Sequence, residues 1–537
     1  MPESTWLKIS NIEQSINDDT ELKQFLANRL QLHSSEIQEI KLLRKSLDAR
    51  NKNRLKFIYT LALLTPENKK LRRHPLVSLY EPPQPPELKP FLKFERQPII
   101  VGTGPAGLFA ALALIEKGYQ PLIFERGRAV SERIHQVEQA WQKGIIDDNS
   151  NVQFGEGGAG TFSDGKLTAR NQDYFAQQVL QRLVKFGAPA EILYQQKPHI
   201  GTDRLRMMLP LIRAYLLDNG AQIQYNHRLE KIFIQNCQLT GIQVNGAHIP
   251  TRTLILAIGH SARDTYHNLF ESGVALESKA FAMGVRVEHP RAFIDQAQYG
   301  QNCDFSITGA ADYRLTYNWK AGQRGIYSFC MCPGGEIILS ASHQGEVVTN
   351  GMSYFKRNKP FSNAGIVVTV HPTDFGTGVL DGIEFQQYIE KRAFEVGGMN
   401  HFAPAQRLAE FVPRQSATVL PETSYQPGVT PVSIEKIFPP FIALALRQGF
   451  LAFERKIPGF IDNGVIIAPE TRTSAPLRIV RNPESFESVN VRGLFPIGEG
   501  AGYAGGIVSS AADGLKLVWR VAAFNSKSSF KEASNRE

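Results

Sequence analysis

The chain has 537 residues, a formal net charge of +9 at pH 7 and 42% hydrophobic residues. This length exceeds what one hydrophobic core organises, so we expect two or three domains, and the apolar content is that of a soluble globular protein. Four cysteines are too few for a disulfide scaffold, no apolar run approaches the roughly 20 residues of a membrane span, and no N-terminal segment has the features of a secretory signal. We therefore expect a cytoplasmic protein that makes no membrane contact.

The first 80 residues are expected to form a small basic α+β domain. Residues 6–9, 37–47 and 54–64 have strand-like patterns, and residues 19–30 have helical spacing after an acidic start. This mixture of elements favours a ferredoxin-like sandwich.

A cluster of positive charge marks this domain, and a stiff proline-rich linker follows it at residues 81–95. We interpret the cluster as a solvated face, with a contact for an acidic partner as the alternative. We do not expect nucleic acid as that partner, because the chain has no recognisable RNA motif and no aromatic residues interleaved with the charges. The cluster consists of Lys41, Arg44, Lys45, Arg50, Lys52, Arg54 and Lys56.

The most informative motif is a glycine turn between a short buried-strand pattern, residues 97–101, and an apolar helix, residues 108–115. Gly102 allows the tight turn, Gly104 lets the backbone approach a pyrophosphate, and Gly107 lets the helix pack close to the strand. The N-terminus of that helix offers free N–H groups and the positive end of its dipole to phosphates.

A second strand, residues 120–124, ends on Glu125. At about 20 residues after the glycines, a carboxylate accepts hydrogen bonds from ribose hydroxyls and disfavours a 2′-phosphate, so NADP is not expected at this site. Strand, turn, helix, strand and acid together predict a Rossmann-type dinucleotide-binding unit. The other residues expected beside the ligand here are Pro105, Ala106 and Arg126.

The far end of the chain decides between NAD and FAD. Residues 490–497 predict a strand that enters a turn containing Gly498 and Glu499, and a helix follows at residues 508–521. An NAD-binding domain has no need of this second turn, whereas the ribityl chain and flavin ring of FAD extend beyond the first βαβ unit. Glu499 is placed to accept from a ribityl hydroxyl, and the helix N-terminus would stabilise negative charge on a reduced flavin. The helix begins after Gly505, Gly506 and Ile507.

Two further segments fit the same plan. Residues 253–258 predict a strand that enters a turn at Gly259, and residues 204–219 predict a helix followed by a strand at 221–225. The loop at residues 154–166 is so rich in glycine that its backbone can lie close to a flat ligand, with a plain flexible surface loop as the alternative. Its expected ligand contacts are Gly157, Gly158 and Gly160.

The chain resembles a bacterial family of FAD-dependent dehydrogenases of unassigned substrate, within the glutathione-reductase-type FAD superfamily. The resemblance implies an α/β fold: a Rossmann-type FAD-binding domain, an inserted α+β substrate domain and the small N-terminal domain. It also implies that the glycine-rich loop lies by the flavin. The superfamily usually has Asp in the C-terminal turn, and this chain has Glu499, which is one methylene longer. The motifs include VGTGPAGLFAAL (101–112), IFERG (123–127), FGEGGAGTFSDGKLTAR (154–170), YSFCMCPGG (327–335) and FPIGEGAGYAGGI (495–507).

The domain boundaries follow from these motifs. The FAD-binding domain is expected at residues 96–275 and 460–525, and the substrate domain is expected to be inserted between them at residues 276–459. A polar tail is expected at residues 526–537.

Two polar residues near the expected flavin are candidates for catalysis. Arg472 could hold a carboxylate substrate or the charge of a reduced flavin, and the alternative is a structural pair with Glu470. His260 could act as a general acid or base, since an unperturbed histidine titrates near neutral pH, and the alternative is that it caps its turn.

Cys330 and Cys332 could pass electrons as a thiol pair or line the substrate pocket, and the sequence favours the pocket. One intervening residue makes a strained disulfide, and a reactive thiol would need a lowered pKa. No cysteine pair has zinc-type spacing, so no metal site is expected.

We expect an oxidoreductase with non-covalent FAD that exchanges a hydride with a small-molecule substrate. The chain has no second dinucleotide motif, so either NAD(P)H docks as a transient reductant without a domain of its own, or the substrate itself reduces the flavin. The alternative is a flavin-carrying binding or regulatory protein that engages an acidic partner through its basic N-terminal domain. The sequence does not indicate the oligomeric state.

Overall fold

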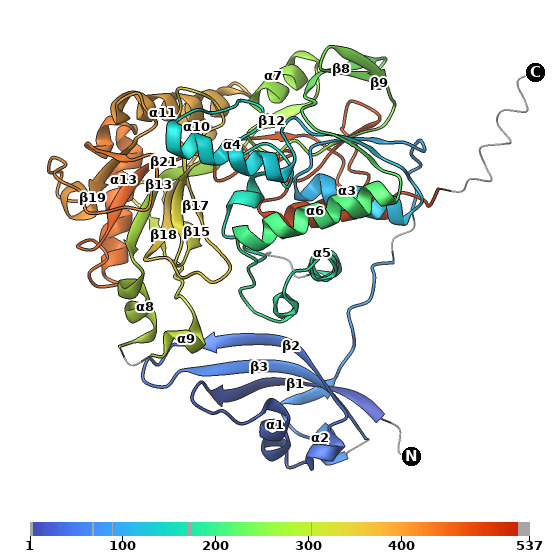
Figure 1. Ribbon diagram of the computed structural model, residues 1–537, viewed down its shortest axis with the longest axis vertical. Helices are drawn as coiled ribbons and strands as arrows, with labels where there is room; N and C mark the ends of the chain where they lie inside the picture. Colours follow the sequence, from blue (N-terminus) through green and yellow to red (C-terminus); the bar gives the residue numbers. More distant parts are fainter. Residues whose placement is uncertain (1–3, 67–68, 88–89, 169–172, 302, 525–537) are drawn as a thin grey trace, which may run out of the picture.

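The computed structural model describes residues 4–66, 69–87, 90–168, 173–301 and 303–524, and the expected polar tail at 526–537 lies outside them. Figure 1 shows a small N-terminal unit below two larger sheet-containing parts that lie side by side.

The N-terminal unit is an antiparallel sheet with helices on one face. Its elements are β1 (Ser4–Ser15), α1 (Leu22–Leu30), the short turn η1 (Ser34–Glu36), β2 (Glu39–Asp48), β3 (Lys56–Pro66), α2 (Lys69–Arg72) and β4 (Val77–Leu79). The strand order is β2-β3-β1-β4, with α1 between β1 and β2 and α2 between β3 and β4, which is the split βαβ connectivity. Leu7, Ile9, Leu61 and Leu63 alternate along the two central strands and are buried with Leu26 of α1.

A backbone contact joins this unit to the rest of the chain. The N–H of Lys45 in β2 donates to the carbonyl of Tyr194 at 2.7 Å, and the N–H of Gln196 donates to the carbonyl of Lys45 at 2.9 Å. Tyr194 and Gln196 follow the turn η3 (Ala190–Leu193). The edge strand of the N-terminal sheet is therefore held against the larger body.

The central part is built on a five-stranded parallel sheet. Its strands are β5 (Ile99–Val101), β6 (Leu122–Phe124), β7 (Gln222–Gln224), β11 (Leu254–Leu256) and β23 (Leu494–Pro496). The order is β23-β11-β5-β6-β7, and every neighbouring pair is parallel. The order reverses at β5, so the carboxyl ends of β5 and β11 border the point at which open α/β sheets bind ligands.

Both faces of this sheet are covered. Helices α3 (Pro105–Glu116), α5 (Tyr174–Lys185), α6 (Thr202–Asp218) and α14 (Ile507–Trp519) share one apolar core with the sheet. Gly514 of α14 allows a close approach to α3, because a Cβ there would lie 2.4 Å from the Ala106 carbonyl oxygen. The other face carries β8 (Leu229–Gln235), β9 (Gln238–Val244), β10 (Ala247–Pro250) and α7 (Arg263–Glu271), which share a second apolar core with the sheet. Helix α4 (Val130–Lys143) packs against α6 and the core of the second large part.

The second large part is a seven-stranded mixed sheet in the order β14-β15-β18-β13-β21-β19-β20. These strands are β13 (Phe281–Pro290), β14 (Thr316–Trp319), β15 (Arg324–Cys332), β18 (Phe361–Val370), β19 (Ala403–Arg407), β20 (Val429–Pro431) and β21 (Val465–Glu470). Strand β21 extends this sheet beyond residue 459, the limit that the sequence predicted for the inserted domain, because its buried apolar run pairs with β13 and β19. Helices α11 (Asp381–Gly397) and α13 (Pro440–Glu454) complete its core.

Short elements connect these parts. They are η2 (Ala159–Phe162), β12 (Leu276–Ser278), α8 (Arg291–Tyr299), α9 (Phe305–Thr308), β16 (Glu336–Leu339), β17 (Thr349–Met352), α10 (Pro372–Phe375), α12 (Leu408–Phe411), η4 (Ile434–Lys436) and β22 (Leu477–Ile479). Within the described ranges, no helix has the length and apolarity that a membrane crossing requires.

Candidate functional site

The first glycine turn lies at the carboxyl end of β5 and is built by close backbone contacts. Gly102 has φ +102°, and a Cβ there would lie 2.3 Å from the carbonyl oxygen of Ala257. A Cβ on Gly107 would lie 2.0 Å from the carbonyl oxygen of Gly102. Gly104 differs, since its Cβ would meet only the Cα of Gly158, at 3.8 Å. The protein itself therefore requires the first and third glycines, whereas Gly104 borders open space at the N-terminus of α3.

Glu125, at the end of β6, is buried and accepts four hydrogen bonds from the protein. One oxygen accepts from the N–H and the hydroxyl of Thr103, at 2.8 and 2.7 Å. The other accepts from the N–H groups of Gly127 and Gly155, at 2.9 and 3.0 Å. A carboxylate has about four acceptor positions, so a ribose hydroxyl would have to share or replace one of these bonds. The expected ribose contact stays a prediction, and Glu125 also ties the first turn to the glycine-rich loop.

The neighbouring Arg126 is engaged with the protein. It donates to both carboxylate oxygens of Asp264 on α7, at 2.9 and 2.7 Å, and its guanidinium lies 4.2 Å from the centre of the Phe154 ring. A contact with the ligand would have to use the outer face of this pair.

The glycine-rich loop is an ordered part of the site, with Phe154 and Phe162 buried. Gly157 and Gly158 have φ values of +84° and +63°, and a Cβ on Gly158 would lie 3.0 Å from the Cα of Gly104. A Cβ on Gly160 would lie 3.2 Å from Ile507, the first residue of α14. The loop therefore passes between the N-termini of α3 and α14.

Arg133 on α4 holds this loop, a role that sequence reasoning missed. Its side chain is fully buried and donates to the carbonyls of Asn151, Val152 and Glu156, at 2.9, 2.9 and 2.6 Å. A buried arginine that satisfies carbonyl groups from three residues fixes the loop conformation. Only the amphipathic spacing of residues 130–143 could have indicated α4, and nothing in the sequence marks this arginine.

The second glycine turn lies at the carboxyl end of β23. The N–H of Gly498 donates to Asp513 at 2.7 Å, and Asp513 in turn accepts two hydrogen bonds from Arg481. A Cβ on Gly505 or Gly506 would meet nothing within 4 Å, and the same holds for Gly259 in the turn after β11. These glycines border open space at the N-terminus of α14.

Glu499 and His260 lie together beside this space. The distance from His260 Nδ1 to Glu499 Oε1 is 3.7 Å, and Glu499 Oε2 accepts from the N–H of Gly506 at 3.4 Å. Burial raises the pKa of Glu499 to about 7. Burial and the charges of Arg472 and Arg263 lower the pKa of His260 to about 3, so its ring is neutral at neutral pH. Of the two, the carboxyl of Glu499 is the group that titrates near neutral pH.

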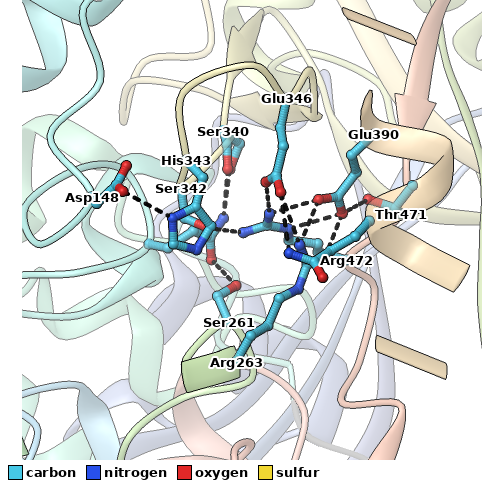
Figure 2. A network of polar contacts seen from close by, with 12 residues as sticks. Asp148, Ser261, Arg263, Ser340, Ser342, His343, Glu346, Glu390, Thr471 and Arg472 are labelled. Carbon is cyan, nitrogen blue, oxygen red and sulfur yellow. Dashed lines mark hydrogen bonds and ion pairs between the residues drawn. The ribbon is translucent and has the colours of Figure 1, made fainter. Parts of the chain in front are cut away.

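Arg472 belongs to a buried ion cluster, shown in Figure 2. Its guanidinium donates to Glu390 and Glu346, at 2.8 and 3.0 Å, and to the Ser342 hydroxyl at 2.6 Å. Arg263 donates to both oxygens of Glu390, at 2.9 and 2.8 Å. The alternative that paired Arg472 with Glu470 is wrong, because α11 brings Glu390 to the arginine instead. With its donors directed at these partners, Arg472 has a structural role in this arrangement.

Glu470 of β21 pairs with Arg286 of the neighbouring strand β13, two residues beyond its register partner Gly284. The distance from Arg286 Nε to Glu470 Oε2 is 2.7 Å, and Nη2 donates to Oε1 at 2.9 Å. Arg286 also donates to the carbonyl of Cys330 at 2.8 Å. Burial raises the pKa of Glu470 to about 7 despite this arginine.

Cys330 and Cys332 lie at the irregular end of β15. Cys330 has φ +41°, and the pairing of β15 with β18 shifts register between Phe329 and Cys332. The ammonium of Lys166, from the glycine-rich loop, donates to the carbonyl of Met331 and lies 2.9 Å from Asp164. The Cys332 thiol donates to the Cys330 carbonyl at 3.4 Å. The charges at the thiols therefore come from Lys166 and Arg286, which sequence reasoning missed.

Among the residues that the structure describes, no group of three or more His, Cys, Asp or Glu is arranged to hold a metal ion.

In the basic N-terminal cluster, Arg50 pairs with Asp48, Lys56 pairs with Glu13, and the Lys45 ammonium lies 4.1 Å from the centre of the Phe57 ring.

Comparison with known proteins places the whole chain. It is 43% identical over 521 residues to a protein of Clostridium beijerinckii (strain ATCC 51743 / NCIMB 8052) named only "Uncharacterized protein", covering 95% of this chain and 98% of that protein. Residues 280–473 match the family described as "FAD-dependent protein, C-terminal domain-like", and residues 4–63 match a domain of unknown function, DUF8436.

Solved structures match more distantly. The L-proline dehydrogenase of P. horikoshii matches with a TM-score of 0.32 and 10% identity, over 80% of this chain and 93% of that one. An oxidoreductase from Methanosarcina mazei matches with a TM-score of 0.33 and 10% identity, over 79% and 99%. CtdE in complex with FAD matches with a TM-score of 0.30 and 12% identity, over 79% and 82%. TM-scores at this level decide neither substrate nor mechanism.

Proposed function

The chain belongs to the same family as the Clostridium beijerinckii protein, and we propose that it is an FAD-dependent oxidoreductase that transfers a hydride between non-covalent FAD and a small-molecule substrate. The match of residues 280–473 to FAD-dependent proteins supports this proposal. NAD(P)H stays a candidate reductant, and a cytoplasmic location stays a prediction.

One observation carries the proposal: two helix N-termini and three glycine turns border the same carboxyl edge of the parallel sheet. Added Cβ atoms at Gly259, Gly505 and Gly506 meet nothing within 4 Å, and Gly104 meets only Gly158. Open space at a helix N-terminus suits an anionic ligand, because the free N–H groups there bind its charge. Glycines at these positions let the ligand approach the protein backbone closely, with no side chain between them. A dinucleotide of the length of FAD would reach from the first turn to the second.

The residues divide the binding task by chemistry. The N-terminus of α3, from Gly104 to Ala106, would hold the pyrophosphate, and the N-terminus of α14 would face the flavin with its positive dipole end. The flavin would supply the hydride transfer when bound. Glu499 would hold a proton at its carboxyl below about pH 7 and carry a negative charge above it.

The purified protein is expected to be yellow and to contain close to one FAD per chain. Denaturation should release the flavin intact, because no cysteine or histidine is required to attach it covalently. Chromatography of the supernatant against FAD and FMN standards measures both identity and amount. FMN alone, or no flavin after reconstitution with FAD, would contradict the proposal, and anaerobic bleaching by NADH, NADPH or a metabolite panel identifies the reductant.

The absorption spectrum of the bound flavin is expected to titrate near pH 7 in the wild type and not in Glu499→Gln. Burial raises the pKa of Glu499 from 4.5 to about 7. The contribution of this carboxyl to the stability of the fold is therefore fully present below about pH 4.5 and is lost as the pH rises through 7. Glu288→Gln is the matched control, since burial also raises the pKa of Glu288 to about 7. Glu288 lies on β13 in the other sheet, where its carboxylate accepts a hydrogen bond from the N–H of Ser424. A titration that persists in Glu499→Gln would assign it to another group.

A further inference from the structure

The region around Cys330 combines two thiols with a buried arginine, Arg286, and a half-buried lysine, Lys166. Cys330 is partly exposed and Cys332 is buried. Arg286 approaches from β13 and binds the Cys330 carbonyl at 2.8 Å, and Lys166 approaches from the glycine-rich loop and binds the Met331 carbonyl. The two cations therefore bind two consecutive backbone carbonyls, those of Cys330 and Met331.

The backbone at this point departs from a regular strand. Phe329 pairs with Gly365 and Cys332 pairs with Asn363, so Cys330 and Met331 lie in a bulge between the two pairs. The φ of +41° places Cys330 in the left-handed region, which is strained for a non-glycine residue. Bulges of this kind redirect a side chain, and here the bulge removes the Cys330 sulfur from the regular alternation of the strand.

The charges that face the Cys330 sulfur come from four elements. The cations are Lys166 and Arg286, and the acids are Asp164, Glu470 and Glu499. Each acid has a competing attachment or a raised pKa. Asp164 is bound by Arg357 at 2.9 and 2.6 Å as well as by Lys166, Glu470 is bound by Arg286, and burial raises the pKa of Glu499 to about 7.

The net field favours the thiolate of Cys330. The interaction with the Cys332 side chain and the charges of Lys166 and Arg286 hold the pKa of Cys330 well below its usual range. The interaction with the Cys330 side chain and burial raise the pKa of Cys332. One thiol is thus prepared to attack and the other to remain protonated beside it.

We propose that Cys330 is a peroxide-reactive thiol and that Cys332 is its resolving partner. The Cys330 sulfur attacks one oxygen of hydrogen peroxide, the O–O bond breaks, and hydroxide leaves, so the sulfur becomes a sulfenic acid. The Cys332 sulfur then attacks the Cys330 sulfur, an S–S bond forms, and the thiol proton leaves with the hydroxyl group as water. Two equivalents of a small thiol reduce the disulfide again. Hydrogen peroxide suits the site because it is small and uncharged, and the sulfur is only partly exposed.

This inference goes beyond the proposed function, because the chemistry needs only the protein and the peroxide. The strain expected of a disulfide across one intervening residue makes it easily reduced rather than forbidding it. The sequence favoured a pocket-lining role because the two cations that activate Cys330 lie far from it along the chain.

The test treats full-length, reduced protein with hydrogen peroxide at pH 7, alkylates the remaining thiols after unfolding, and quantifies each cysteine peptide by mass spectrometry. We expect the peptide that holds Cys330 and Cys332 to lose both thiols together, and reductant to restore them. The exposed Cys237 should remain reduced over the same interval. In Cys332→Ser, dimedone should label Cys330, whereas in Cys330→Ser residue Cys332 should stay reduced. Cys303→Ser is the matched control and should behave as the wild type.

A second arm tests the cation. Lys166→Met should raise by about one unit the pH at which Cys330 reaches half its maximal rate of oxidation, so oxidation measured below that pH should slow on the order of tenfold. Lys166→Arg should restore most of the rate, and Lys197→Met, which removes an exposed lysine paired with Asp312, should leave it unchanged. If Lys166→Met does not fold, the wild type alone decides. The rate at which iodoacetamide alkylates Cys330 is measured against pH. The pH at which this rate is half its maximum should be lower in the folded chain than in the chain unfolded in urea.

Three results would overturn the proposal: oxidation of Cys237 as fast as that of Cys330, absence of dimedone labelling in Cys332→Ser, or equal half-rate pH values in the folded and unfolded chains. Flavin content is measured in the same samples. If the thiols do not react although FAD is present, this proposal fails and the proposed function stands. If the thiols react although FAD is absent, the proposed function fails and this proposal stands.

Discussion

Gly104→Val is expected to lose most of its FAD while the protein keeps its fold. Gly104 has φ −69° and ψ 178°, which valine adopts readily, and its Cβ would meet only Gly158, at 3.8 Å. The branched side chain would instead enter the open space at the N-terminus of α3, where we propose that the pyrophosphate lies. A clash that costs about 1.4 kcal/mol already lowers affinity tenfold, and we expect a larger loss. Flavin content and circular dichroism of the same preparation measure both effects.

Two substitutions calibrate this result. Gly104→Ala adds a single methyl group in ordinary contact with Gly158, so it should fold and show an intermediate flavin content. Gly107→Ala should instead destabilise the fold itself, since its Cβ would lie 2.0 Å from the Gly102 carbonyl oxygen. A Gly104→Val protein with full FAD content would refute the assignment of this turn to the pyrophosphate.

Glu390→Gln is expected to destabilise the protein by about 3–5 kcal/mol, the cost of breaking a buried ion pair from one side. Glu390 is fully buried and accepts from Arg263 and Arg472, so the substitution leaves two buried guanidinium groups with Glu346 as their remaining carboxylate. Urea unfolding followed by fluorescence, in the presence of excess FAD, measures the loss.

The sign of the pH dependence follows from the same cluster. The charges of Arg263 and Arg472 outweigh burial and lower the pKa of Glu390, so its contribution to stability is present above its ordinary pKa of 4.5 and is lost as pH falls below it. The wild type should therefore lose its advantage over Glu390→Gln in acid. Glu384→Gln, on the first turn of the same helix, is the matched control and should change stability little. Equal stability of Glu390→Gln and wild type at pH 7 would show that the cluster is not a stabilising one.

Elements with a local signature were predictable. The turn at Gly102, Gly104 and Gly107 and the helix predicted at residues 204–219 are confirmed, the latter as α6 (Thr202–Asp218). Backbone conformation at a glycine turn and the apolar face of a helix depend on neighbours within a few residues, so the sequence carries them.

Interactions between distant segments were not predictable. The partners of Arg472 come from α11 and from the loop that holds Glu346, and the lysine that binds the Met331 carbonyl comes from a loop 165 residues away along the chain. A buried charge gives no periodic signal in the sequence, and its role depends on the residues that the fold places beside it. The roles of Arg133, Lys166 and Arg286 therefore required the structure.

The parallel sheet has a consequence for how the protein is made. Strands β11 and β23 and helix α14 complete a layer that begins at β5, and the two segments meet where the Tyr119 hydroxyl donates to the carbonyl of Ala522, 403 residues later. A ribosome that adds 5–20 residues each second needs roughly 20–80 s to span that interval. During that time the apolar surface of α3 that α14 will cover stays exposed, and the nascent chain lacks the second glycine turn of the proposed FAD site. A chain that stops before β23 (Leu494–Pro496) would lack both the second glycine turn and α14 (Ile507–Trp519), so we expect it to retain no flavin.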